Sequence, residues 1–225
     1  MVKAAWFRNY TQDELPAKFQ RIVPRWDASN TTELSPHPNP PPHAGRGRVG
    51  CTSWGIQAKE LYLLDVLRRR MEYPELSRAV RDQYALFRSS VVLIEDKASG
   101  TQLIQELVAD GLHAVTRYQP RQDKVMRMHA QTAMIENGSV HVPKTAPWLA
   151  AYLHELTVFP NGRHDDQVDS TAQLLDWFKR VAGPSSNAGI WHSYKERYEA
   201  QQAGSQAARP EPLSVIAKRM GLLRW

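Results

Sequence analysis

Cysteine is nearly absent from this sequence: Cys51 is its single residue of that type. One cysteine cannot build an internal disulfide framework or a thiolate metal cluster. No hydrophobic run approaches the roughly 18 residues that a membrane-spanning helix requires, and the N-terminus lacks the apolar segment of a signal peptide. These absences predict a cytoplasmic protein that has no disulfide bonds and does not associate with membranes.

The excess of positive over negative charge is also small. The 225 residues include 29 Lys and Arg against 23 Asp and Glu, which gives a formal charge of +6. This balance mildly favours polyanionic partners, although many basic proteins bind no nucleic acid. Because 42% of the residues are hydrophobic, the chain is long enough and apolar enough for one well-buried globular domain followed by a tail.

Short apolar runs alternate with helical hydrophobic patterns along most of the chain. The patterns predict strands at residues 21–26, 51–56, 61–67, 91–94, 113–118 and 140–142, and helices at 74–87, 123–136, 147–156 and 165–181. Residues 96–100 are expected to end a strand and to cap a further helix that runs to about residue 110. The second and third strands are expected to form a hairpin, and Pro24 argues for an edge or bulged position of the first strand. The alternation predicts an α/β fold in which helices flank a mixed β-sheet.

Two segments stand apart from the packed core of this domain, which we expect to span residues 1–182. Residues 35–48 contain five of the 15 prolines, so they cannot form a helix or an interior strand and are expected to be an inserted loop. Residues 183–225 are rich in Ser, Gln, Ala and Pro. We expect them to form a loosely attached, flexible tail with helices at 189–202 and 212–223.

The glycines at the end of the proline-rich loop imitate a nucleotide-binding motif. Residues 45–50 match G-x-G-x-x-G, but phosphate-binding loops of this kind need a preceding strand and a following helix. Here a proline run precedes the motif and a strand follows it. His37 and His43 in the same loop have no nearby cysteine or carboxylate with which to bind a metal. We therefore expect neither a nucleotide cofactor nor a histidine metal site in this segment.

Five acidic residues stand where predicted elements end or begin: Asp27, Glu95, Asp165, Asp166 and Asp169. Each has an ordinary explanation, because Asp is common in turns and acids stabilise the first turn of a helix. However, Glu95 follows a buried apolar strand, where its charge needs a metal ion or a cationic partner. Carboxylates from two strand ends and one helix start can converge on a divalent cation such as Mg²⁺. From this pattern alone, a structural role and a metal site both remain open.

Several motifs resemble, in order and spacing, the C-terminal nuclease domain of tailed-bacteriophage terminase large subunits. The resemblance covers residues 6–182. It rests on residues 61–66 (LYLLDV), 72–76 (EYPEL), 94–103 (IEDKASGTQL), 124–127 (KVMR), 136–138 (ENG), 146–149 (APWL) and 165–170 (DDQVDS). It implies a ribonuclease-H-like fold and a Mg²⁺-dependent endonuclease, with Mn²⁺ as a substitute ion, that cuts concatemeric phage DNA during genome packaging.

The resemblance also implies roles for individual acids. The sequence WDAS at residues 26–29 resembles the family's first acidic motif, which makes Asp27 a bridging metal ligand. Glu95 corresponds to the second acid and Asp166 to the third, with Asp165 as an assistant or an alternative. Asp169, one helical turn after Asp166, is expected to be structural. Two Mg²⁺ ions held by these acids would activate a water that cleaves the phosphodiester bond, so no nucleophilic side chain is needed.

Double-stranded DNA is the partner that the resemblance implies. Lys97, Lys124 and Arg127 are expected to neutralise its phosphates, although a solvated charged face explains them equally well. Complete large terminases also carry a packaging ATPase, and we expect this chain to lack one and to depend on a separate ATPase, a small terminase subunit or a portal. The proline-rich insertion beside Asp27 leaves an alternative open: an inactive prophage remnant that folds and binds DNA or a packaging partner. Another ribonuclease-H-like enzyme, such as a junction resolvase, fits the tail and residues 165–170 less well.

Overall fold

The structure, a computed structural model, describes residues 1–27, 47–97 and 99–182. The predicted proline-rich loop up to residue 46, including His37 and His43, lies outside the described residues. The predicted tail and its helices at 189–202 and 212–223 also lie outside them. All statements about the fold below concern the described part of the chain.

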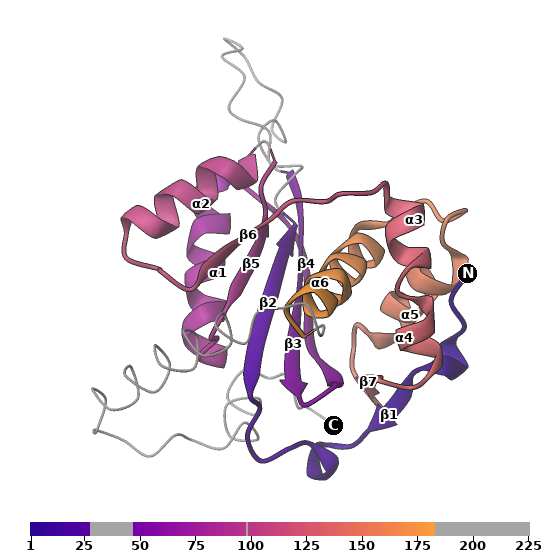
Figure 1. Cartoon of the computed structure of the whole chain (residues 1–225). Coiled ribbons are helices and arrows are strands. Elements are labelled where there is room, and N and C mark those ends of the chain that lie inside the picture. Colours follow the sequence, from indigo (N-terminus) through magenta and orange to yellow (C-terminus); the bar gives the residue numbers. More distant parts are fainter. Residues whose placement is uncertain (28–46, 98, 183–225) are drawn as a thin grey trace.

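Within that part, seven strands form one mixed sheet in the order β1-β7-β4-β3-β2-β5-β6 (Figure 1). Strand β3 pairs in antiparallel fashion with both β2 and β4, and the remaining neighbours pair in parallel. The predicted α/β fold with a mixed sheet is therefore confirmed. The strands are β1 (Arg8–Tyr10), β2 (Arg21–Asp27), β3 (Gly47–Gln57), β4 (Glu60–Met71), β5 (Val92–Glu95), β6 (Val115–Tyr118) and β7 (Val140–Pro143).

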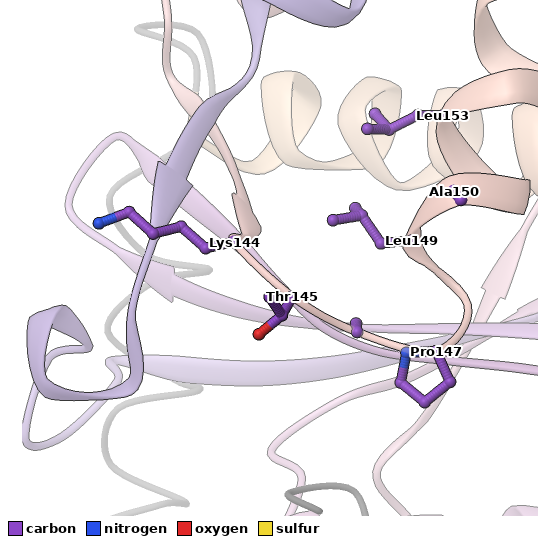
Figure 2. A pocket seen from close by; sticks show the side chains of 7 residues that line it. Lys144, Thr145, Pro147, Leu149, Ala150 and Leu153 are labelled. Carbon is purple, nitrogen blue, oxygen red and sulfur yellow. The ribbon is translucent and has the colours of Figure 1, made fainter. Parts of the chain in front are cut away.

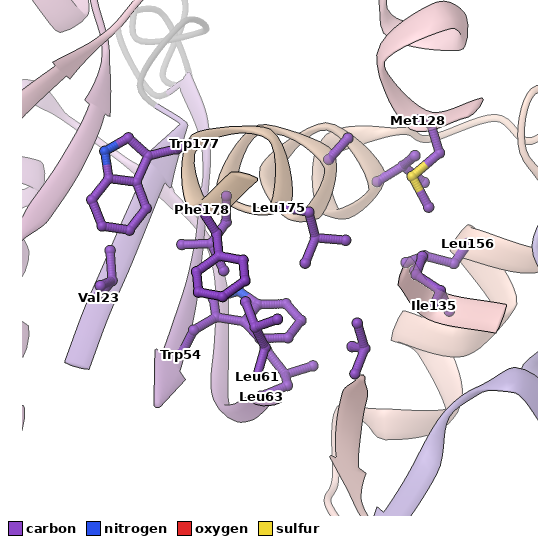
Figure 3. Packing of buried hydrophobic residues seen from close by; sticks show 14 of the residues in the cluster. Val23, Trp54, Leu61, Leu63, Met128, Ile135, Leu156, Leu175, Trp177 and Phe178 are labelled. Atoms are coloured by element: carbon purple, nitrogen blue, oxygen red, sulfur yellow. The ribbon is translucent and has the colours of Figure 1, made fainter. Parts of the chain in front are cut away.

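Helices cover both faces of the sheet (Figure 1). On one face, α1 and α2 pack against a hydrophobic cluster that includes Trp26 and Ile94. On the other face, α6 and the shorter helices α3, α4 and α5 pack against a larger cluster that includes Trp54, Leu93 and Phe178 (Figure 3). The helices are α1 (Tyr73–Phe87), α2 (Ser99–Ala109), α3 (Lys124–His129), α4 (Thr132–Glu136), α5 (Leu149–Val158) and α6 (Asp166–Ala182), and two single-turn 3₁₀ helices lie at Ala4–Trp6 and Gln12–Glu14.

Strand β2 lies in the interior of the sheet, between β3 and β5, so the edge or bulged position predicted from Pro24 is wrong. Proline lacks the N–H group that an interior strand normally donates. Here the regular ladder between β2 and β5 begins at Arg25, which pairs with Leu93, directly after Pro24. The proline therefore interrupts only the start of the ladder, and β2 remains a central strand.

The hairpin of β3 and β4 is longer than the sequence predicted. Its ladder reaches from the turn at Ala58 to a final pair between Gly47 and Met71. Gly47 and Arg48 therefore belong to β3 rather than to the inserted loop, and residues 47–50 of the G-x-G-x-x-G match lie in a strand. The far half of β4 contains three consecutive arginines, and this exposed charge concealed its strand character.

Other boundaries differ by small amounts. The predicted helix at 123–136 is divided into α3 and α4 at Gln131, whose N–H bonds to the carbonyl of Met128, three residues earlier, as in a 3₁₀ turn. Strand β1 was not predicted because its three residues are too few to show a period. Within the described ranges, none of the helices has the length and apolar character needed to cross a lipid bilayer.

Candidate functional site

The ends of β2 and β5 bring two of the predicted acids together. These strands are parallel neighbours in which Trp26 pairs with Ile94, so the next residues, Asp27 and Glu95, lie side by side. Side chains alternate along a strand, and Trp26 and Ile94 belong to the core under α1 and α2. Asp27 and Glu95 therefore face the other side of the sheet, where α6 packs. Both are nearly buried, with 5% and 7% of their surfaces exposed.

The third predicted acid, Asp166, is the first residue of α6. The start of this helix is attached to the sheet because the Ser170 hydroxyl lies 2.6 Å from that of Thr52 and 3.4 Å from the carbonyl of Arg25. Burial raises the pKa of Asp166, and the negative charge of Asp27 raises it further. Asp27 and Asp166 thus lie within electrostatic range of each other, at the same end of the sheet.

Glu95 has a cationic partner that sequence reasoning missed. Arg25, which is completely buried, donates from Nη2 to Oε2 of Glu95 at 3.1 Å. Gln173 on α6 donates to the same oxygen at 2.8 Å and also accepts a hydrogen bond from Arg25. The signal was present, since Arg25 precedes Asp27 by two residues and must share its face of the strand. The charge of Glu95 therefore has a compensating partner within the chain.

Asp166 lies between two arginines of the β3–β4 hairpin. Arg48 is 3.6 Å and Arg68 is 3.5 Å from its Oδ2. These distances are too long for hydrogen bonds, and this buried oxygen accepts none from the described residues. Arg48 instead donates to Nδ1 of His164 at 2.7 Å. The two arginines partly oppose the rise in the pKa of Asp166, which burial and Asp27 cause.

Lys124, at the start of α3, bridges the acids that begin α6. Its Nζ is 3.0 Å from Asp165 and 3.9 Å from Asp169, and 46% of its side chain is exposed. Burial alone would lower the pKa of Lys124, but the hydrogen bond to Asp165 and the charges of Asp169, Asp165 and Asp27 raise it. Lys124 therefore remains protonated beside the acids.

Lys97 and Arg127, the other two residues predicted to contact DNA, differ in how exposed their side chains are. Lys97 is exposed two residues after Glu95, as a phosphate contact requires. Arg127 is buried, forms an ion pair with Asp169 and donates to the carbonyl of Gln122 at 2.7 Å. We no longer expect Arg127 to contact DNA, because its guanidinium is engaged inside the protein. The same ion pair gives Asp169 an internal partner, in agreement with the structural role expected for it.

The described residues do not include three His, Cys, Asp or Glu side chains that stand close enough together to hold a metal ion. Glu95, Asp165 and Asp166 each lie beside a lysine or an arginine of the same chain. The acids share one end of the sheet without converging on a single point.

A hydrophobic groove lies elsewhere, beside the connection from β7 to α5 (Figure 2). Its lining includes Lys144, Pro147, Leu149 and Leu153. None of the predicted acids lines this groove, and Lys144 is the single ionisable side chain among the residues that do. It offers no group suited to hydrolysis, so the acids at the ends of β2, β5 and α6 form the candidate site.

Solved structures of terminases share this fold. The large terminase nuclease of thermophilic phage G20c with bound zinc superposes with a TM-score of 0.51 at 16% identity, covering 75% of this chain and 92% of that one. The human cytomegalovirus terminase nuclease domain superposes with a TM-score of 0.51 at 8% identity, and the match covers 79% of this chain and 95% of that domain. The large terminase of a second thermophilic bacteriophage gives 0.51 at 10% identity, covering 74% and 43%, so this chain spans less than half of that protein.

These similarities confirm the predicted ribonuclease-H-like arrangement of sheet and helices, and at such identities they show the fold alone. No curated protein matched the sequence. A sequence profile, in contrast, matches more than half of the chain, over residues 49–176, which include Glu95 and Asp166. The chain therefore belongs to the family described as the Terminase RNaseH-like domain.

Proposed function

We propose that the chain is a divalent-metal-dependent endonuclease that cuts double-stranded, concatemeric phage DNA during genome packaging. The observation that carries this proposal is the placement of Asp27 and Glu95 on adjacent parallel strand ends, with Asp166 at the start of the helix that packs against them. Membership of a terminase family supports it. The related nuclease of phage G20c is described with bound zinc, which supports a role for a divalent ion.

The chemistry of the donor groups fits a hard divalent cation. Asp27, Glu95 and Asp166, with Asp165 as a further candidate, provide only carboxylate oxygens, which Mg²⁺ and Mn²⁺ prefer. One of these oxygens, Oδ2 of Asp166, is buried without a hydrogen-bond partner among the described residues. The hydrogen bonds that Arg25 and Gln173 donate to Glu95 are both made to Oε2. The carboxylates must turn towards one another to bind a shared ion.

Each group of the chain has a defined task in the proposed reaction. The acids hold the cations at the end of the sheet, and when bound, these ions supply an activated water and stabilise the charge that develops on the phosphate and the leaving 3′ oxygen. Lys97 and Lys124 neutralise neighbouring phosphates of the DNA backbone. Because backbone contacts carry no base information, we expect cleavage with low sequence preference. A separate packaging ATPase, a small terminase subunit or a portal would direct it.

Cleavage of supercoiled plasmid tests this proposal. We expect the purified protein to nick or linearise the plasmid with Mg²⁺ or Mn²⁺ and to be inactive in excess chelator. Asp27→Asn is the matched control, because it removes one charge from the site at nearly constant volume. Cleavage that persists in chelator, or that Asp27→Asn leaves unchanged, contradicts the metal mechanism.

A second candidate function is DNA binding without cleavage by an inactive prophage remnant. The observation that favours it is the buried pair of Arg25 and Glu95, in which a guanidinium already compensates one of the required acids. This candidate predicts no cleavage with any divalent ion and salt-sensitive DNA binding in a mobility-shift assay. The plasmid assay therefore separates the two functions.

A further inference from the structure

A buried glutamate outside the predicted acids binds the start of α6. Glu155 lies on α5 and is 5% exposed. Its Oε1 accepts hydrogen bonds from the backbone N–H groups of Gln167 at 2.6 Å and Val168 at 3.4 Å. Its Oε2 accepts one from the side-chain amide of Gln167 at 2.6 Å. The first N–H groups of a helix have no partner within the helix and favour a negative charge, so Glu155 stabilises this terminus.

The group that caps α6 comes from another helix, because the side chain at the usual capping position already accepts a hydrogen bond from Lys124. The residue before a helix normally caps it through a short polar side chain. Here that residue is Asp165, whose carboxylate accepts a hydrogen bond from Lys124 at 3.0 Å. The residues that Glu155 holds, Gln167 and Val168, directly follow Asp166. The orientation of the first turn of α6, and with it the position of the Asp166 carboxylate, therefore depends on a contact with α5.

A second contact connects Glu155 to the Asp166 carboxylate through Arg68. Arg68 on β4 places Nη1 3.5 Å from Oε2 of Glu155 and Nη2 3.5 Å from Oδ2 of Asp166. One guanidinium thus spans both acids. Glu155 fixes the backbone on which Asp166 stands and also holds the arginine that lies beside the Asp166 side chain.

We propose that Glu155 is a positioning residue that sets Asp166 for metal binding, through the N–H groups that start α6 and through Arg68. This role rests on the proposed function, since it has meaning for Asp166 as a metal ligand. Glu155 itself touches neither the cation nor the DNA. Removal of partners of this kind around metal ligands typically weakens metal binding by about 10- to 100-fold.

Glu155→Gln tests the role by calorimetric titration of Mn²⁺ into the full chain. The substitution keeps the size of the side chain but removes its charge and one of its two acceptor oxygens. We expect a loss of Mn²⁺ affinity of about tenfold or more. Glu136→Gln is the matched control, because Glu136 is an exposed glutamate at the end of α4, and it should bind Mn²⁺ as the wild type does.

A double-mutant comparison separates positioning from simple loss of negative charge. If Glu155 acts through Asp166, then adding Glu155→Gln to Asp166→Asn should leave the residual Mn²⁺ affinity unchanged, because Asp166 no longer binds. A general electrostatic effect would weaken binding by the same factor in both backgrounds and would overturn the positioning role. If Glu155→Gln does not fold, Gln167→Ala removes the side-chain donor alone, and it should reduce affinity in the same direction by a smaller factor.

The outcomes distinguish this role from the proposed function. If the wild type binds no Mn²⁺, both are wrong. If the wild type binds Mn²⁺ and neither Glu155→Gln nor Gln167→Ala changes its affinity, the positioning role alone is wrong. Selective loss of affinity in the single variants, absent from the Asp166→Asn background, supports it.

Discussion

At the scale of single residues, cations of the chain itself accompany the acids of the candidate site. Arg25 compensates Glu95, Arg68 and Arg48 flank Asp166, and Lys124 bonds to Asp165. Nearly buried carboxylates placed close together repel each other unless positive charge balances them. In these contacts, lysine and arginine side chains provide that balance.

Neutralising individual acids should separate ligands from structural residues. We expect Asp27→Asn, Glu95→Gln and Asp166→Asn each to remove most plasmid cleavage. Without metal, the melting temperatures of Asp27→Asn and Asp166→Asn should stay near or above that of the wild type. Asp169→Asn should instead lower stability by about 3 kcal/mol, because it leaves the buried Arg127 without its partner. Cleavage assays and thermal melts of the four variants measure both effects. Cleavage that depends on Asp169 but not on Asp166 would show that the third acid is assigned wrongly.

Arg25→Met tests whether a guanidinium competes with metal for Glu95. Without metal, the variant should lose about 3–5 kcal/mol of stability, because Glu95 remains buried without a cation. Its gain in melting temperature on adding Mn²⁺ should then exceed that of the wild type, because the metal becomes the compensating charge. Arg81→Met, on the surface of α1, is the control. An equal Mn²⁺-induced shift in wild type and Arg25→Met would show that Arg25 does not compete.

At the scale of elements, the acids depend on how closely strands and helices approach one another. The clearest example is Gly100, near the start of α2. A Cβ atom at this position would lie 2.1 Å from the backbone carbonyl oxygen of Glu95. No side chain fits there without movement of the backbone that carries Glu95. The glycine is therefore part of what places the second acid.

Gly100→Ala should consequently reduce both stability and activity. We expect a loss of about 1–3 kcal/mol from overpacking, together with reduced cleavage because Glu95 is displaced. Gly50→Ala is a suitable comparison, because a Cβ atom at Gly50 meets nothing within 4 Å. Chemical denaturation and plasmid cleavage of the two variants provide the measurement. Wild-type behaviour of Gly100→Ala would mean that the start of α2 can move without affecting Glu95.

The strands and the helix that carry the acids could be predicted from the sequence, but the contacts that hold these elements together could not. The apolar run before Glu95 and the acidic start of the last helix show their roles locally, and both were predicted. The pair of Arg25 and Glu95 joins residues 70 positions apart and exists only because β2 and β5 are neighbours in one register. The capping of α6 by Glu155 similarly requires α5 to pack beside it. Local patterns contain neither relationship, so both became visible only in the folded chain.

At the scale of the whole molecule, one buried acid away from the predicted site should make stability depend on pH. Burial raises the pKa of Asp65, and hydrogen bonds from the Val66 backbone, Gln83 and Trp148 only partly oppose this. The folded state therefore holds a proton on Asp65 more tightly than the unfolded state does. Stability from this group is complete below the unfolded pKa of about 4 and is lost as pH rises through the raised folded value.

Asp65→Asn should remove the loss of folding stability that ionisation of Asp65 causes as pH rises. Relative to the wild type, the variant should be more stable at pH 7, by about 1.4 kcal/mol for each unit by which the folded state raises the pKa, and the advantage should disappear near pH 4. Asp82→Asn, at an exposed position on α1, should show no such trend. Urea denaturation across this pH range measures the difference. An advantage that is independent of pH would indicate that repacking, rather than ionisation, causes it.

The proposed cleavage requires Asp27, Glu95 and Asp166 to bind a divalent ion together. The most direct test is a crystal structure of the wild-type protein with Mn²⁺, with the ion located by its anomalous scattering. We predict anomalous density at the adjoining ends of β2, β5 and α6, within coordination distance of all three carboxylates. Full Mn²⁺ occupancy elsewhere, or a site without Mn²⁺ in which Arg25 and Arg68 still hold the acids at saturating Mn²⁺, would show that these three acids do not bind the ion.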